Sequence, residues 1–302
     1  MHARIALALL VFAALAKTAL AADDRSVESA EALQAILDKA MPELLKGKAP
    51  DVFRKIVPDG QVDDFSRRLQ SQFKPLQEKL GSPIDWMCVG VRKRGNTFRE
   101  YVYVCRYDYY PVVWRMTAAE DKGRWRFMGG HFDSDYSALL AQAATDAASE
   151  NSDYAQLADK VGDALAHGRG NAIDIMKANL LVSDSEKDPE KLRNSVEEVM
   201  ARVVLAGGVA KFELGASKNV AGVIAERSYL VKCERSLLRL HFLMYRPGKE
   251  WKLLGFQYRV ITNADEMFGN APLEPISPAA PSKLSQTIIG SRGRDARDGR
   301  TK

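Results

Sequence analysis

The sequence predicts an α+β protein with two tandem repeats, each made of N-terminal helices followed by a curved four-stranded antiparallel meander. In each copy, apolar residues first follow a helical spacing and then alternate with polar residues along short strands. Residues 125–129 (WRFMG) match residues 251–255 (WKLLG), and the pattern Leu44-x-x-Gly47 matches Leu165-x-x-Gly168. Cys105 is matched with Cys233, which requires a two-residue gap in the turn that follows. The matches keep their order along the chain, which indicates an internal duplication.

The first copy begins with helical periodicity over 33–44. A short helix is expected near 51–56, and a third helix over 65–76, where Pro75 is expected to kink or shorten it. Strands are predicted at 84–91, 98–107, 111–117 and 124–132. Glycine-containing turns at 94–96 and 121–123 divide these strands into two hairpins.

The second copy repeats this order. Helices are predicted over 157–165, 171–178 and 192–203, the last one preceded by Asp188-Pro189 as N-cap and first helical residue. Strands are predicted at 210–216, 224–233, 237–245 and 251–260.

A final strand that opens with a glycine turn and a tryptophan, after helices and a curved meander, resembles the NTF2-like (cone-shaped α+β) superfamily. The resemblance is strongest to its small secreted families of unknown function. It is carried by Gly123, Trp125, Phe127 and Phe132 in the first copy, and by Gly248, Trp251, Leu253 and Phe256 or Tyr258 in the second. It implies a sheet wrapped around helices with an apolar pocket between them. Such folds serve as enzymes, ligand binders and interaction modules. A cystatin-like unit with a single helix is the alternative fold.

The two ends of the chain differ from its body. Arg4, an apolar run from Ile5 to Leu15, and the small-residue exit at 19–21 are typical of a secretory signal peptide. We therefore expect a signal peptide at 1–21, NTF2-like repeat 1 at 22–136, a linker at 137–153, repeat 2 at 154–263 and a disordered basic tail at 264–302. The expected location is the periplasm or the exterior of the cell.

The charge distribution argues against nucleic acid as a partner. The net charge is +5, but the excess lies in the two ends, and residues 22–270 hold equal numbers of basic and acidic residues. The tail is interpreted as solvated, with contact to anionic surfaces as the alternative. No apolar run after the signal peptide is long enough to cross a bilayer.

An aromatic run in the first copy is the strongest candidate for binding. Residues at alternate positions of a strand share one face, so the tyrosines from 101 to 107 form one surface. The candidate binding residues are Tyr101, Tyr103, Tyr107 and Trp114, with Arg106 and Arg115 as polar anchors. The competing interpretation is an ordinary sheet core. The function that these residues favour is that of an exported soluble binding or protein-interaction protein, whose ligand would be a small apolar molecule or a protein.

Catalysis is the alternative. His131 and Asp133 lie at a strand end and could form a general-base pair for an isomerase or hydrolase. Gln257 stands at the matching position of the second copy, so the repeat does not require the histidine. Motifs for metal, phosphate or a serine nucleophile are missing from the sequence, so no cofactor and no metal are expected.

The three cysteines raise the question of a disulfide. If the turn after Arg94 closes a tight hairpin, Cys88 and Cys105 become near-opposite neighbours on one face, within disulfide range. An exported protein meets oxidising conditions. We therefore expect a Cys88–Cys105 bond, with three reduced core cysteines as the alternative, and a buried free thiol at Cys233.

The export signal has a direct test. Mass spectrometry of the protein recovered from a secreting host should show a chain that starts at Ala22, because signal peptidase cuts after the small residues at 19–21. An intact Met1 on protein recovered outside the cytosol would refute the prediction.

Overall fold

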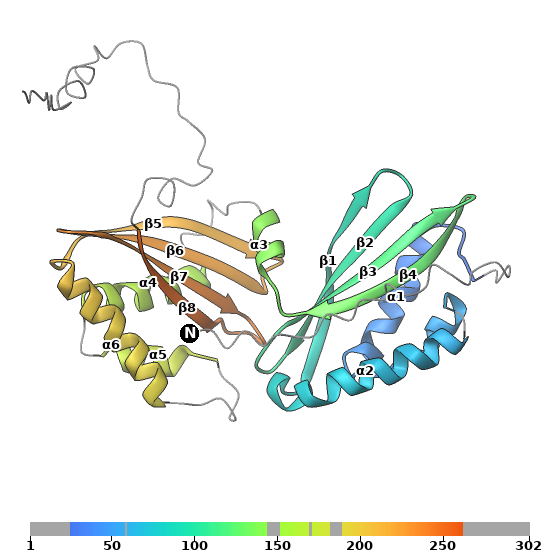
Figure 1. Cartoon of the computed structure of the whole chain (residues 1–302), viewed down its shortest axis with the longest axis horizontal. Helices are drawn as coiled ribbons and strands as arrows, with labels where there is room; N and C mark the ends of the chain where they lie inside the picture. The colour runs from blue at the N-terminus through green and yellow to red at the C-terminus, as the bar shows by residue number, and fades with distance from the viewer. Residues whose placement is uncertain (1–24, 58, 144–151, 169–170, 182–188, 262–302) are drawn as a thin grey trace, which may run out of the picture. The chain divides into compact units, whose positions relative to one another are not determined.

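The computed structural model describes residues 25–57, 59–143, 152–168, 171–181 and 189–261. It confirms the α+β class: two four-stranded antiparallel sheets are each preceded by helices (Figure 1). The described residues belong to one compact unit. The predicted signal peptide and basic tail lie outside the described residues, and the predicted repeat boundaries stay predictions.

The elements of the first copy are α1 (Ala30–Leu44), the 3₁₀ helix η1 (Asp51–Lys55), α2 (Asp59–Leu80), β1 (Pro83–Arg94), β2 (Phe98–Tyr107), β3 (Val112–Asp121) and β4 (Arg124–Asp133). A short helix, α3 (Ser137–Gln142), follows. The elements of the second copy are α4 (Asp153–Ala166), α5 (Ala172–Asn179), α6 (Pro189–Leu205), β5 (Val209–Val220), β6 (Ile224–Cys233), β7 (Leu237–Tyr245) and β8 (Lys252–Ile261). Every predicted strand is present.

Serine caps begin the first helix of each copy. The Ser29 hydroxyl accepts the Ala32 N–H at 3.0 Å, and the Ser152 hydroxyl accepts the Ala155 N–H at 3.4 Å. Each cap satisfies one of the N–H groups that a helix leaves without an internal partner. Pro75 does not shorten α2 as predicted, because the helix continues to Leu80, which is buried in the core.

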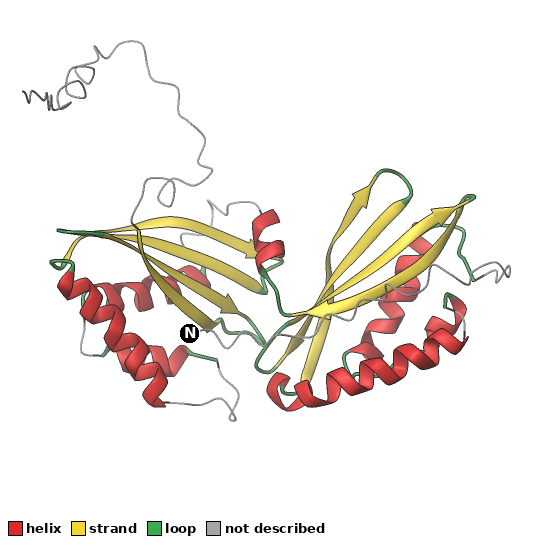
Figure 2. Cartoon of the chain, viewed as in Figure 1, coloured by secondary structure: helices red, strands yellow, loops and turns green. Residues whose placement is uncertain are grey.

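The helices of each copy lie on one face of that copy's sheet, called here the inner face (Figure 2). The apolar stripe of α1 packs on the inward-pointing residues of β2 and β3, and α4 does the same on β6 and β7. Burial of these apolar side chains is the main favourable contribution to folding, at about 25 cal/mol per Å².

The two sheets repeat each other at a constant separation along the chain. Their strand orders are the same, β1-β2-β3-β4 and β5-β6-β7-β8. Arg94 pairs with Phe98 across the first hairpin and Val220 pairs with Ile224 across its counterpart, so equivalent residues lie 126 positions apart. The duplication predicted from the sequence therefore has a structural counterpart.

Three register irregularities recur at this separation. Two lie on the edge strands β1 and β5, at Pro83/Asp85 and Val209/Lys211 and at Cys88/Gly90 and Leu214/Ala216. The third lies at Thr117/Ala118 and Leu243/Met244, where the extra residue is on the edge strand β4 or β8. Bulges on edge strands twist the exposed hydrogen-bonding groups and so hinder pairing with another chain.

One part of the sequence alignment of the copies is wrong. The constant separation makes Val231 the equivalent of Cys105 and makes Tyr107 the equivalent of Cys233. The predicted match of Cys105 with Cys233 is therefore displaced by two residues, whereas the match of Trp125 with Trp251 is confirmed. Matching by the rare residue type introduced a gap that the hairpins do not contain.

The outer face of the first sheet is partly covered. A cluster of buried side chains there joins three valines of β2 and β3 to α3 and to the second copy: Val102, Val104, Val113, Tyr136, Leu139, Leu140, Val220, Val223, Ile224 and Tyr245. The Tyr245 hydroxyl accepts the Tyr107 N–H at 2.9 Å and donates to the Tyr107 carbonyl at 2.8 Å. These two bonds satisfy the backbone of Tyr107, the last residue of β2, which lies beyond the β2–β3 pairing that ends at Cys105 and Val112.

The predicted Cys88–Cys105 disulfide is not formed, and all three cysteines are free. Cys88 lies opposite Tyr103 and Cys105 lies opposite Trp86, so the two cysteines are diagonal neighbours on one face. Diagonal neighbours have Cα atoms about 7–8 Å apart, beyond the usual span of a disulfide. The bulge after Cys88 sets this register. Cys233 is a buried free thiol, as predicted.

Thiol titration checks this result. Three thiols per chain should react in denaturant. In the native protein, Cys88 should react first, because Cys105 and Cys233 are only 0% and 4% exposed and burial raises the pKa of the Cys105 thiol well above its usual value. A single reactive thiol in denaturant would contradict the free-cysteine arrangement.

Candidate ligand-binding site

The aromatic residues of the first copy lie on the inner face of its sheet. Tyr101, Tyr103 and Trp114 are 0% exposed and Tyr107 is 1% exposed. They pack between the sheet and the helices together with the apolar stripe of α1. With so little exposed area they present no surface to a ligand in this structure, and their placement favours the core interpretation.

All three tyrosines form hydrogen bonds with α1 or with the residue that follows it, through their hydroxyl groups. Tyr101 donates to the Ala30 carbonyl at 2.9 Å and Tyr107 donates to the Leu45 carbonyl at 2.8 Å. Tyr103 donates to a carboxylate oxygen of Asp38 at 2.8 Å. Burial raises the pKa of Tyr103, and the hydrogen bond to Asp38 raises it further, so this hydroxyl keeps its proton and remains a donor.

The predicted anchors Arg106 and Arg115 lie on the outer face of the same sheet. Each is adjacent in sequence to an inward-pointing residue, and successive side chains of a strand point to opposite faces. Arg106 pairs with Asp85 and also donates to the Arg246 carbonyl at 3.4 Å. The structure therefore does not bring the aromatic residues and the arginines together.

The candidate catalytic pair also lies on the outer face. Asp133 accepts from Arg115 at 2.7 Å and from the Asp135 N–H at 2.8 Å, whereas the His131 ring nitrogen lies 3.8 Å from its carboxylate. That last distance is beyond a hydrogen bond. Burial raises the pKa of Asp133, although Arg115 opposes this. The carboxylate is thus held by an arginine rather than directed at a histidine.

A carboxylate in each copy was missed by the sequence analysis. In the second copy the Tyr229 hydroxyl donates to Asp159, as Tyr103 does to Asp38 in the first. Asp38 and Asp159 are separated by the same number of residues as Gly47 and Gly168. Extending the helix alignment to polar positions would have found this repeated pair.

The second copy adds an arginine to the pair. Arg227 stands where the first copy has Tyr101, and its guanidinium lies 3.1 Å from Asp159 and donates to the Tyr229 hydroxyl at 2.7 Å. The Arg227 side chain is 4% exposed, and among the described residues one of its terminal nitrogens has no hydrogen-bond partner. Asp159 therefore supplies the charge that makes burial of this guanidinium tolerable.

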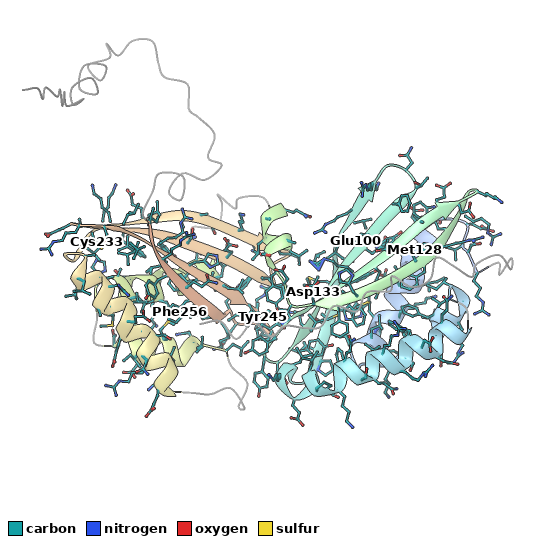
Figure 3. The ribbon with its side chains drawn as sticks, viewed as in Figure 1. Glu100, Met128, Asp133, Cys233, Tyr245 and Phe256 are labelled. Atoms are coloured by element: carbon teal, nitrogen blue, oxygen red, sulfur yellow. The ribbon has the colours of Figure 1, made fainter. Side chains whose placement is uncertain are left out.

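An apolar groove opens on the first copy, between η1, the start of α2 and β4. It is shallow and open to solvent, and it is lined by Phe53, Val57, Gln61, Val62, Phe65, Phe127, Met128 and Gly129. Met128, labelled in Figure 3, is the extra residue of the β4 bulge and is 51% exposed. Four of the other lining residues belong to the buried core, so the groove has an apolar floor and a flexible thioether at its rim.

Within the described ranges, no group of three or more His, Cys, Asp or Glu residues is arranged to hold a metal ion. The described helices include none with the length and hydropathy needed to cross a bilayer.

No protein-family model matches the sequence, and no curated protein matches it. Solved structures with similar folds include a candidate NTF2-like transpeptidase from Campylobacter jejuni. It is 17% identical, the likeness covers 34% of this chain and 99% of that one, and the TM-score is 0.30.

Two further solved structures are similar over both copies. An NTF2-like protein involved in plasmid conjugation is 9% identical over 70% of this chain and 89% of that one, with a TM-score of 0.22. A cystatin-like protein from Ruminococcus gnavus is 7% identical over 67% of this chain and 74% of that one, also with a TM-score of 0.22. Structural similarity of this extent gives no information about the ligand or the activity of this protein.

The repeated Tyr–Asp pair predicts different costs for one substitution in the two copies. Asp159→Asn keeps an acceptor for Tyr229 but removes the charge beside Arg227. It should destabilise the protein by about 2–3 kcal/mol, below the full cost of breaking a buried ion pair because Asp159 is 46% exposed. Asp38→Asn, the matched control, should cost less than about 1 kcal/mol. Chemical denaturation measures both, and equal losses would contradict a charge-compensating role for Asp159.

Proposed function

We propose that the protein is an exported, non-catalytic binding protein, and that the groove of the first copy receives an apolar ligand or the apolar side chains of a partner. The groove itself carries this proposal. Apolar side chains of η1, α2 and β4 line it, and it is open to solvent, so an apolar group can enter it from outside.

The lining of the groove supports binding rather than catalysis. All of its lining side chains are uncharged, and Gln61 supplies the only polar side chain. An enzyme pocket needs titratable groups that converge on one reacting atom. The titratable candidates His131 and Asp133 are not among the groove's lining residues. A site of this composition is suited to hold an apolar group and to orient it through one amide.

The bulge of β4 explains why the groove is open. Thr117 pairs with Gly129 and Ala118 pairs with Phe127, which leaves Met128 without a partner on β3. Gly129 has a φ of 142°, a conformation that side-chain-bearing residues rarely adopt. The extra residue turns the Met128 side chain out of the sheet, where its methyl group can adjust to ligands of different shape.

Export to the periplasm or the exterior is part of the proposal and is supported by the composition of residues 1–21 alone. Binding of an apolar group in the groove requires no cofactor.

Substitution at the groove rim tests the proposal. The probe is N-phenyl-1-naphthylamine, an uncharged apolar dye whose fluorescence rises on binding. Met128→Lys should weaken dye binding by roughly tenfold, because a charge at the rim opposes desolvation of the groove. Phe98→Lys is the matched control, since Phe98 is 49% exposed in the same copy but lies outside the groove. It should leave dye binding unchanged. Equal effects of the two substitutions, with both variants folded by circular dichroism, would refute the groove as the binding site.

A further inference from the structure

One end of the second copy carries exposed apolar and basic side chains together. This end, called here the β6–β7 tip, is where α6 ends, β5 begins and β6 turns into β7, and Figure 3 marks it with Cys233, the last residue of β6. The residues that define the tip are Val204, Leu205, Lys211, Glu213, Lys232, Glu234, Arg235, Arg239 and Arg259.

Backbone contacts hold the end of α6 against the β6–β7 turn. The Arg235 N–H donates to the Ala206 carbonyl at 2.9 Å. Gly207 has a φ of 93° and approaches Glu234 so closely that a Cβ there would lie 2.8 Å from the Glu234 side chain. The last turn of α6 and the β6–β7 turn therefore form one continuous surface.

Two adjacent apolar side chains project from this surface. Val204 is 73% exposed and Leu205 is 70% exposed, whereas the next most exposed large apolar side chain among the described residues is Met128, at 51%. The end of a helix is ordinarily polar in water, and two neighbouring aliphatic side chains there indicate contact with something apolar.

The sheet is basic at this end on its outer face, the face away from α6, because each of its basic residues is adjacent in sequence to an inward-pointing residue of the core. Lys211 lies directly opposite Lys232, and Arg239 lies directly opposite Arg259. Like charges at directly opposed positions of a sheet are destabilising. Five basic residues of the tip stand against two acidic ones, Glu213 and Glu234, which gives a net charge of +3.

The first copy provides an internal comparison, because the frame is the same and the side chains differ. Gly81 has a φ of 79°, and the Tyr109 N–H donates to the Leu80 carbonyl at 3.0 Å, which repeats the contacts of Gly207 and Arg235. The residues at the positions equivalent to the tip are Glu78, Lys79, Asp85, Met87, Arg106, Asp108, Tyr109, Val113 and Asp133. They hold two basic and four acidic residues, a net charge of −2.

The copies therefore share a backbone that does not require either set of side chains. Glu78 and Lys79 show that the last turn of this helix accommodates charged residues, and the Asp85–Arg106 ion pair shows that opposite charges fit where the second copy has Lys211 and Lys232. The apolar pair and the excess of positive charge in the second copy are properties of its surface and not requirements of its fold.

We propose that the β6–β7 tip docks on an anionic lipid surface, with Val204 and Leu205 entering the boundary between headgroups and acyl chains. Arg235 of the turn and the basic side chains of the outer face at the same end meet the headgroup phosphates. A bilayer interface offers apolar contact and negative charge within one layer, which is the combination that this tip complements. This proposal is independent of the groove in the first copy, which lies on other elements.

Vesicle flotation tests the proposal with the full chain. The chain should float with vesicles of equal parts phosphatidylcholine and phosphatidylglycerol, and roughly tenfold less with phosphatidylcholine alone, with binding that weakens as salt rises. Val204→Glu/Leu205→Lys gives the tip the residues of the first copy, so the fold should be kept while vesicle binding falls roughly tenfold. Lys232→Glu/Arg235→Glu should have a similar effect on binding to the anionic vesicles.

The matched control is the reverse exchange in the first copy. Glu78→Val/Lys79→Leu creates an apolar pair within a surface that has no excess of positive charge, so it should leave vesicle binding at the level of the unmodified chain. All variants keep residues 1–24 and 262–302 unchanged. A difference in vesicle binding between two variants is therefore caused by the substituted residues.

Three outcomes would overturn the proposal. The first is failure of the unmodified chain to float with anionic vesicles. The second is unchanged flotation of Val204→Glu/Leu205→Lys, as would result if the basic C-terminal segment alone bound the lipid. The third is a dimer by light scattering that this double substitution dissociates while vesicle binding persists, which would show that the apolar pair covers a second copy of the chain.

Discussion

The hydroxyl groups of buried tyrosines determine where the first helix lies on its sheet. Tyr101, Tyr103 and Tyr107 alternate along β2 on the inner face, and their hydroxyls bind α1 near its start, in its middle and just after its end. A buried hydroxyl without a partner would cost about 1–3 kcal/mol, so a slide of the helix along the sheet would break several bonds at once. Apolar packing alone would restrain such a slide far less, because it is non-directional.

The second copy keeps one of these three bonds and changes the others. Tyr229 still binds a carboxylate on the first helix, but Arg227 and Cys233 occupy the positions of the other two tyrosines. The helix is then held by a charged group of three side chains in place of a row of hydroxyls. The central Tyr–Asp contact is the part of the arrangement that both copies share.

The duplication leaves each copy with a different surface on the same frame. Equivalent residues keep their register through all three irregularities, so the backbone is insensitive to what the outer face and the helix end carry. In the first copy the bulge of β4 presents Met128 beside a groove. In the second copy the equivalent Leu254 packs with the cluster that joins the copies. One fold thus supplies two places where a partner could attach, each built from residues that the core does not need.

The sequence by itself determined the α+β class, the helix-then-meander order, the strands and the duplication, because these depend on local periodicity and turn residues. It also determined that the tyrosines of β2 share a face.

The sequence did not determine the strand register, because a single bulge after Cys88 shifts the pairing and leaves no distinct pattern in the residues. The predicted disulfide failed for this reason. The partners of the tyrosine hydroxyls, the separation of Arg106 and Arg115 from the aromatic face, and the open groove were decided only by the tertiary structure. Each depends on which residues distant in sequence come within a few ångströms of each other, and that follows from the packing of helices on the sheet rather than from any local pattern.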